Sequence, residues 1–318
     1  MKGFRVLAIV AAVAVYGQIV LGGVVRITGS GLGCPDWPAC QGKIVPDFAN
    51  SHVVIEYAHR LVGSTAGLLM VATAAYALLL FYRPRAGAAM PRGLMVAAVA
   101  GVGLIVLQGI LGGITVLMGN SPFTVAIHLG NALLVLAAAL LMALWAGRAH
   151  RRSTTPAATS GGVVPVFLYG SLAAAFLIVV SGAYVVGSGA GSACTSWPLC
   201  GAATRTASTD THFLHRVVVV LASLVILRAV HFAQRRWRGT PMATVSYLVA
   251  AAFVLEVAIG AAQVLNGLPE VLRASHLAVA TLVWSGVVLL AAAYWLETRL
   301  EMANATVPAR AMREATAG

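Results

Sequence analysis

The chain has 318 residues, of which 60% are hydrophobic and only 9% are charged. A soluble protein of this composition would expose far too much apolar surface, so the balance excludes an ordinary soluble domain and indicates a membrane protein. The formal net charge of +12 could suggest a nucleic-acid partner, but the positions of the cations decide between these interpretations.

Eight apolar segments follow one another along the chain, and each is long enough to cross a hydrocarbon core that is roughly 30 Å thick. They cover residues 4–23, 56–82, 93–118, 122–147, 163–187, 210–234, 242–265 and 272–297. The first segment resembles a signal peptide, but its exit into a glycine and cysteine loop recurs after the fifth segment, where no signal peptide could lie. We therefore predict an all-α integral membrane protein with eight permanent transmembrane helices.

Most cations lie at the two termini and on alternate connections, which is the distribution that the positive-inside rule gives the cytoplasmic side. They are Lys2, Arg5, Arg83, Arg85, Arg92, Arg148, Arg151, Arg152, Arg235, Arg236, Arg238, Arg299, Arg310 and Arg313. We therefore predict that both termini are cytoplasmic and that the partner is the lipid bilayer, with no nucleic acid. The opposite connections contain all four cysteines, which indicates the oxidising outer face of the cell membrane.

The second half of the chain repeats the first. The run Gly29-Ser30-Gly31, followed by Cys34, Trp37-Pro38 and Cys40, matches Gly187-Ser188-Gly189, followed by Cys194, Trp197-Pro198 and Cys200. The stretch 106–128 matches 254–276 without gaps, at an offset of 148. We predict two pseudo-symmetric four-helix bundles in parallel orientation, with domains at 1–150 and 163–298, a cytoplasmic linker at 151–162 and a cytoplasmic tail at 299–318.

Four histidines occupy matching places near the outer ends of the even-numbered segments: His59, His128, His215 and His276. Two histidines on facing helices of a bundle can supply both axial ligands of a heme iron. A single histidine near a membrane interface more often only bonds a carbonyl, but four repeated ones favour ligation. We predict the pairs His59 with His128 and His215 with His276, and no bare zinc site, since each half lacks a third ligand.

One carboxylate distinguishes the halves. Glu56 stands three residues before His59 on the same helical face, whereas the matching residue before His215 is His212. A carboxylate beside a heme could accept a proton or stabilise positive charge on a carbon that is being oxidised, and N-capping of the helix is the structural alternative. We favour the chemical role, which makes the first half the reactive site and the second half the electron-handling one.

Two further sets of residues have weaker signals. Arg60 and Arg216 follow two of the histidines and could bind heme propionates or anchor lipid headgroups, and both interpretations stay open. Glu256 lies deep in the seventh segment at the position that Gln108 holds in the third, so it is a functional candidate without an assigned role.

The four cysteines form two pairs with a spacing of six residues, and on the oxidising side we expect disulfides Cys34–Cys40 and Cys194–Cys200. We favour stapling of the loops over the alternative, a redox relay by the first pair. The spacing is not Cys-X-X-Cys-His, so attachment of a c-type heme is not indicated.

Together these residues resemble the heme A synthase family of the CtaA and Cox15 type, over nearly the whole chain. The most specific pieces are Gly22-Gly23-Val-Val-Arg26, the run Cys-Pro-Asp-Trp-Pro-Ala-Cys at 34–40, and Glu56-Tyr-Ala-His59-Arg60; the remaining histidines complete the pattern. The resemblance implies oxidation of the C8 methyl group of heme o to a formyl group through the hydroxymethyl stage, with oxygen from water and loss of four electrons. The product, heme a, serves terminal oxidases.

The resemblance also implies how the sites are used. The substrate heme o would lie between His59 and His128, and a heme b cofactor between His215 and His276, while Glu56, Cys34 and Cys40 are associated with activity. It further suggests handover of substrate from heme o synthase, the protoheme farnesyltransferase, and is compatible with a homo-oligomer. Two rival classes are a non-enzymatic diheme electron-transfer cytochrome and a membrane thiol oxidoreductase without heme.

Overall fold

The computed structural model describes residues 1–48, 50–84, 90–148, 164–201 and 204–316, so the predicted linker 151–162 lies outside the described residues. Eight α-helices and two short 3₁₀ helices make up the described part, which contains no β-strand. The helices are α1 (Lys2–Ile27), α2 (Ser51–Tyr82), α3 (Arg92–Leu117), α4 (Pro122–Arg148), α5 (Val164–Gly187), α6 (Ala207–Arg236), α7 (Pro241–Leu265) and α8 (Glu270–Thr316), with η1 (Ser30–Leu32) and η2 (Ala190–Ser192).

All eight α-helices are long and apolar enough to cross a membrane, which confirms the predicted number of spans. Large apolar side chains also point away from the protein interior along them, as Leu68, Leu224 and Leu248 do with 71%, 67% and 63% of their surface exposed. Exposure to water costs about 25 cal/mol for each Å² of apolar surface, whereas contact with lipid tails does not. The chain is therefore a multi-pass membrane protein.

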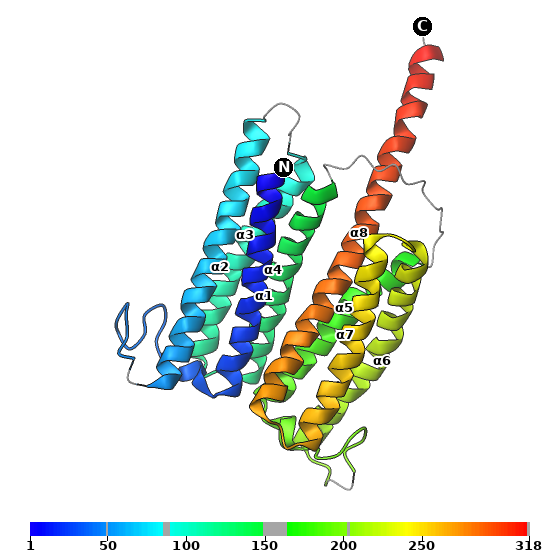
Figure 1. Ribbon diagram of the computed structural model, residues 1–318. Coiled ribbons are helices and arrows are strands. Elements are labelled where there is room, and N and C mark those ends of the chain that lie inside the picture. Colours follow the sequence, from blue (N-terminus) through cyan, green and yellow to red (C-terminus); the bar gives the residue numbers. More distant parts are fainter. Residues whose placement is uncertain (49, 85–89, 149–163, 202–203, 317–318) are drawn as a thin grey trace.

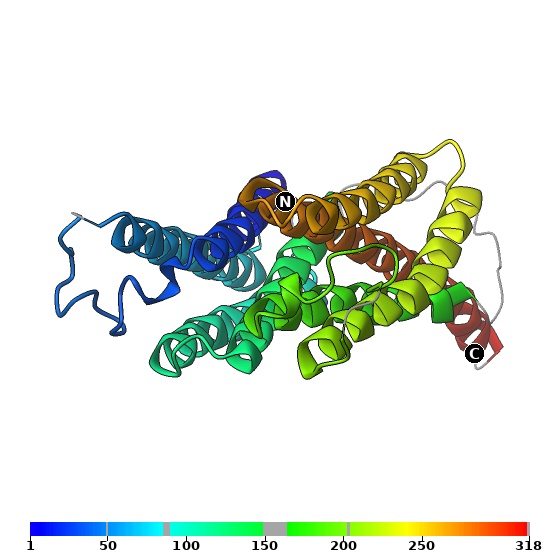
Figure 2. The same ribbon diagram turned by 90° about the horizontal axis from the view of Figure 1, so that it is seen from below.

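The helices form two neighbouring groups of four (Figure 2). Helices α1 to α4 pack in a ring in which each contacts the next and α4 returns to α1, and α5 to α8 do the same. Helices α2 and α4 therefore lie diagonally across the first group, and α6 and α8 across the second. Both termini lie at one end of the helices, and the two loops with cysteines lie at the other end (Figure 1).

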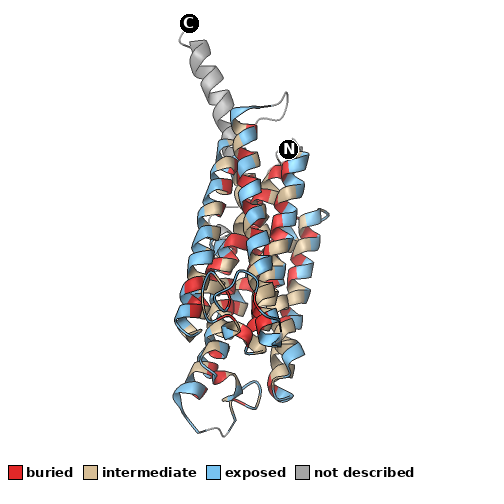
Figure 3. Cartoon of the chain, turned by 90° about the vertical axis from the view of Figure 1, so that its left-hand side faces the viewer, coloured by how far each residue is buried: buried red, intermediate tan, exposed pale blue. Residues whose placement is uncertain are grey.

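Helices α1, α4, α5 and α8 join the two groups. The Tyr16 hydroxyl donates to the carbonyl oxygen of Ala278 (3.2 Å), and Trp284 Nε1 donates to that of Leu133 (3.0 Å). One continuous cluster of buried apolar residues includes side chains from both groups, and Figure 3 marks the buried residues along the helices in red. The two groups thus share a single hydrophobic core.

Two helix ends differ from the predicted ones by five residues or more. Helix α2 begins at Ser51, five residues earlier than predicted, because the side chain of Asn50 accepts the backbone N–H of His52 and caps the helix. Glu56 therefore has no N-capping role. Helix α8 continues to Thr316 beyond the predicted end at residue 297, through a stretch rich in Ala, Glu, Arg and Met, which are strong helix formers.

The internal match needs one correction. Gly29 and Gly189 each precede a 3₁₀ helix with left-handed backbone (φ 68° and 73°), so Gly29 corresponds to Gly189, at the same offset of 160 as Cys34 and Cys194. The predicted pairing of Gly29 with Gly187 was wrong because Gly187 still belongs to α5. Glycine adopts the left-handed conformation without steric cost. This conformation identifies Gly189 as the equivalent residue, whereas the Gly-Ser-Gly motif alone does not distinguish it from Gly187.

Candidate functional site: two histidine pairs beneath disulfide loops

Each predicted histidine lies against a glycine of the odd-numbered helix that precedes it in the chain. The pairs are His59 with Gly22, His128 with Gly112, His215 with Gly182, and His276 with Gly260. A β-carbon on any of these glycines would meet Cε1 of the ring at 3.0 to 3.2 Å, which is tighter than ordinary side-chain contact. No sequence pattern indicated these four specific ring contacts.

The two histidines of each predicted pair lie on diagonal helices of one group. His59 lies on α2 and His128 on α4, which are diagonal helices of the first group. The same holds for His215 on α6 and His276 on α8 in the second group. Each half therefore carries one histidine on each of two diagonal helices, and each ring lies against a glycine of a neighbouring helix.

Polar side chains on the odd-numbered helices contact these rings. In the first half, the amide nitrogen of Gln18 lies 2.9 Å from Nδ1 of His59, and that of Gln108 lies 3.2 Å from Nε2 of His128. Sequence reasoning missed Gln18 and treated Gln108 only as the match of Glu256, because a glutamine in an apolar helix has no motif of its own.

The second half uses different chemistry. Ser181 Oγ lies 2.8 Å from Nδ1 of His215, and Oε1 of Glu256 lies 2.9 Å from Nδ1 of His276. Glu256 has only 7% of its surface exposed. The structure thus places this candidate, which had no predicted role, beside one of the four histidines.

Glu56, Arg60 and the Cys34–Cys40 loop form one connected cluster. Arg60 Nε donates to Oε1 of Glu56 (2.9 Å), and its terminal nitrogens donate to the carbonyl oxygens of Asp36 (2.8 Å), Ala39 (2.6 Å) and Cys34 (2.7 Å). Glu56 is buried, with 4% of its surface exposed. Arg60 therefore ties the disulfide loop to the buried carboxylate, a role that its place beside His59 did not predict.

The second half repeats this clamp without the carboxylate. Arg216 Nη1 donates to the carbonyl oxygens of Ser196 and Pro198 (both 2.9 Å), and its Nη2 lies 3.4 Å from Nε2 of His212. Nδ1 of His212 in turn donates to the carbonyl oxygen of Ala190 (3.2 Å). Propionate binding by Arg60 and Arg216 remains a prediction. In this structure both side chains donate to carbonyl oxygens of the loops.

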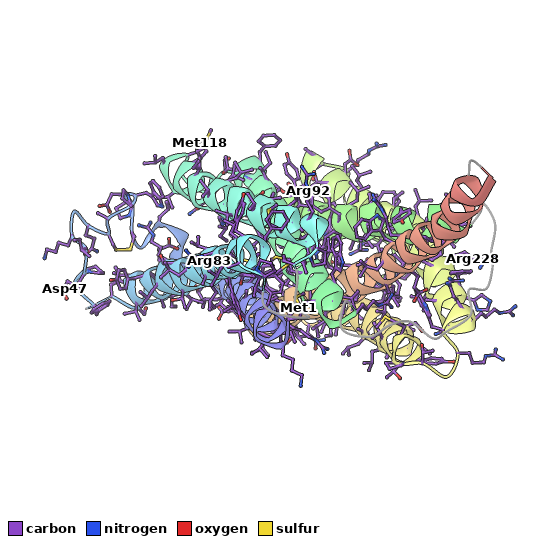
Figure 4. All side chains as sticks on the ribbon, turned by 90° about the horizontal axis from the view of Figure 1, so that it is seen from above. Met1, Asp47, Arg83, Arg92, Met118 and Arg228 are labelled. Atoms are coloured by element: carbon purple, nitrogen blue, oxygen red, sulfur yellow. A yellow bond between two sulfur atoms is a disulfide. The ribbon has the colours of Figure 1, made fainter. Side chains whose placement is uncertain are left out.

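Both predicted disulfides, Cys34–Cys40 and Cys194–Cys200, are present. In the first loop, Asp36 accepts the backbone N–H groups of Gln41 (2.6 Å) and Gly42 (2.8 Å), which both have positive φ. The hydrogen bond from Gly42 is the main reason why the pKa of Asp36 lies below its usual value, and that from Gln41 adds to it. Figure 4 shows the sulfur–sulfur bond in the loop that carries Asp47.

An apolar groove of about 510 Å³ lies elsewhere, between α4, α5 and α8. Its walls include Leu134, Phe176 and Trp284, and none of the four histidines lines it. The groove is therefore separate from the histidine pairs.

The donor set of each half fits a heme. A porphyrin supplies four nitrogens to iron, so the protein needs to add only two axial ligands, and each half offers two imidazoles. Among the described residues, no group of three or more His, Cys, Asp or Glu side chains is placed to hold a bare metal ion. The glycines beneath the rings leave room for the imidazoles in a tightly packed helix group.

These features define a class: helical membrane proteins with two histidine pairs beneath loops closed by disulfides. Residues 5–289 match the COX15-CtaA family model, described as cytochrome oxidase assembly protein, so the chain belongs to this family. It is 32% identical to heme A synthase of Geobacillus kaustophilus (74% of this chain, 73% of the relative). It is 31% identical to that of Exiguobacterium sibiricum (78% and 81%), and 29% identical to that of Shouchella clausii (83% and 88%). The predicted resemblance is confirmed.

Proposed function

We propose that the protein is a heme A synthase, an oxidoreductase that converts the C8 methyl group of heme o into the formyl group of heme a through the hydroxymethyl stage. In balance, the methyl group and one water give the formyl group, four protons and four electrons. Family membership over nearly the whole chain is the observation that carries this proposal. Membership of this family does not favour the alternative of a non-enzymatic diheme cytochrome.

The residues divide into two sites in this proposal. His59 and His128 hold the substrate heme o, and His215 and His276 hold a heme b cofactor, which supplies one-electron redox chemistry when bound. The placement of the buried carboxylates supports the assignment: among the described residues, Glu56 in the first half contacts the loop arginine Arg60, whereas Glu256 in the second half lies beside His276 and away from Arg216.

Glu56 is the catalytic carboxylate in this proposal. Its burial and its contact with Arg60 keep it in one place beneath the disulfide loop, where it can take a proton from water or from the oxidised carbon. The Cys34–Cys40 disulfide closes the loop whose carbonyls Arg60 holds, which supports a stapling role for this pair near the reactive site.

The proposal includes the wider arrangement. Two pseudo-symmetric bundles, 1–150 and 163–298, carry the two sites, supported by equivalent ring contacts, loop clamps and positive-φ glycines in both halves. The basic residues at the end with the termini support a cytoplasmic location for that end and an outer location for the heme sites and cysteine loops. Handover from the farnesyltransferase that makes heme o, and a homo-oligomer, complete the proposal.

The test is to express the chain in a membrane host that makes heme o but no heme a, and then to identify extracted hemes by chromatography and mass. Heme a or its hydroxymethyl precursor is the expected result. Bound heme b without either product, with heme o supply confirmed, would instead favour the electron-transfer cytochrome. A chain purified without heme would point to the thiol oxidoreductase.

A further inference from the structure

The apolar groove between α4, α5 and α8 lies on the seam between the two helix groups, since α4 belongs to the first group and α5 and α8 to the second. Aliphatic and aromatic side chains line it, among them Phe176 and Trp284. Three of its lining residues, Leu134, Tyr169 and Ala173, are exposed, so the groove opens to the outside of the protein. In a membrane, a hydrocarbon chain fills such a groove at no cost, whereas water does not.

The groove has the depth of one membrane leaflet. On α8 its lining runs from Trp284 to Trp295, which is roughly 16 Å along the helix axis. Half of a hydrocarbon core is about 15 Å thick. Helix α8 runs toward the end of the molecule that carries both termini (Figure 1), so Trp295 lies near the membrane surface at that end and Trp284 lies deeper. One acyl chain of this leaflet therefore matches the groove in length.

A guanidinium lies at the surface end of the groove. Arg299 follows Trp295 by one helical turn, its Cζ lies 5.1 Å from the centre of the Trp295 ring, and it ends the apolar span Glu270–Arg299. The ring of Trp145 on α4 meets the Trp295 ring edge to face, with 5.1 Å between the centroids. Tryptophan and arginine at the end of a span lie at the level of the lipid headgroups. Arg299 is therefore placed where a lipid phosphate lies.

The positive charge at this end of the groove exceeds the negative charge among the described residues. Glu297 is engaged by Arg148 (3.2 Å), by Arg236 (3.4 Å) and by Nε1 of Trp237 (3.0 Å). It precedes Arg299 by two residues, which places the two side chains about 200° apart around α8. Three guanidiniums therefore accompany one carboxylate, and such a surplus favours an anionic headgroup over a zwitterionic one.

We propose that the groove binds an anionic phospholipid of the leaflet on the side of the termini. One acyl chain lies along α4, α5 and α8, and the phosphate lies beside Arg299. The lipid thereby packs against both helix groups at their seam. The inference depends on the membrane-spanning fold and not on the proposed function. The uncharged farnesyl tail of heme o is the other apolar chain at hand, but it gains nothing from a cation at this end of the groove.

Quenching of tryptophan fluorescence by brominated phospholipids tests the proposal. The full chain is placed in phosphatidylcholine nanodiscs that contain, at equal mole fraction, either dibrominated phosphatidylglycerol or dibrominated phosphatidylcholine. Bromine quenches on contact, so the two series give the relative binding constant of the anionic lipid. We expect a preference for phosphatidylglycerol of about fivefold or more, because each arginine near a membrane surface contributes roughly that factor. W295F should remove most of this excess quenching, since it removes the reporting ring.

A charge variant tests the headgroup contact. R299Q keeps a long polar side chain but removes the charge, so the preference for phosphatidylglycerol should fall about fivefold. R228Q is the matched control, because Arg228 also stacks on an aromatic ring, that of Phe167 (5.4 Å). Phe167 lies about 200° around α5 from Tyr169, which lines the groove, so R228Q should keep the parental preference.

A second variant tests the chain contact. A173F fills the groove from its exposed side without changing any charge. It should lower the quenching of Trp295 by both lipids, whereas R299Q should lower only the excess for phosphatidylglycerol. Each variant is compared with itself in the two lipids, so a change in tryptophan brightness caused by the substitution cancels. The result for R299Q decides the question even if A173F does not fold.

Three outcomes would overturn the inference. The first is equal quenching by the two lipids in the parent, and the second is an excess for phosphatidylglycerol that survives R299Q. The third is protection of Trp295 from both lipids when heme o is added, without any such excess, which would assign the groove to the tail of the substrate. The quenching needs no bound heme, so a chain that makes no heme a contradicts the proposed function and leaves this inference standing.

Discussion

The two cysteine loops have the same framework but enclose different chemistry. In each loop, an arginine from the following helix donates to loop carbonyl oxygens beside a disulfide. Arg60 also pairs with a buried carboxylate, Glu56, whereas Arg216 contacts a histidine, His212. The framework is thus duplicated while the carboxylate is not, which teaches that an internal repeat can conserve a scaffold and still specialise one copy.

The comparison extends to the histidines. All four rings lie against a glycine, but the polar side chains beside them are glutamines in the first half and a serine and a glutamate in the second. The positions of the rings and their packing against glycine are therefore shared, whereas the neighbouring polar side chains differ.

The largest expected effect concerns the second pair. His276→Ala removes one of two proposed axial ligands, so we expect loss of most or all heme b from the purified protein, measured by its visible spectrum. His231→Ala, at an exposed position near the other end of α6, is the control and should keep the parental spectrum. A normal heme b spectrum in the His276 variant would break the assignment of this half.

The next effect is confined to the first half. Glu56→Gln keeps the shape of the side chain but removes its proton-accepting charge, so heme a formation should fall by about 10²- to 10⁴-fold while the heme b spectrum stays intact. The matched variant His212→Gln should affect heme a formation far less. Equal losses in both variants would remove the proposed distinction between a reactive half and an electron-handling half.

The two arginine clamps should differ in their contribution to stability. Arg60→Ala leaves the carboxylate of Glu56 buried without its cation, which costs about 3–5 kcal/mol. Arg216→Ala leaves only carbonyl oxygens and a neutral ring, so about 1–3 kcal/mol is expected. Thermal unfolding in detergent measures both, and a larger loss for Arg216→Ala would contradict the pairing of Glu56 with Arg60.

The smallest effect is a local pH dependence. The Asp36 carboxylate has a pKa below its usual value in the folded loop, so it stabilises the loop above its unfolded pKa of about 4, and this contribution is lost as the pH falls through the lower folded value. Hydrogen exchange at the amides of Gln41 and Gly42 should therefore show less protection in acid. Asp36→Asn should remove this dependence, and the second loop, with Ser196 at the matching position, should lack it.

Several features were predictable because they depend on local composition. The eight spans follow from runs of apolar residues, and the disulfides from cysteine spacing on one side of the membrane. The pairing of Gly29 with Gly187 failed because glycine occurs at both 187 and 189. Only the backbone conformation of Gly189 identifies it as the equivalent position.

The sequence by itself determined the class of protein, the number of spans and the four histidines, since hydrophobic length and repeated motifs are properties of the chain alone. Only the tertiary structure decided that Arg60 clamps the loop, that glycines lie against the imidazoles, and that Gln18 and Glu256 face different histidines. These contacts join residues on separate helices, and the way helix faces meet depends on packing that no local pattern records.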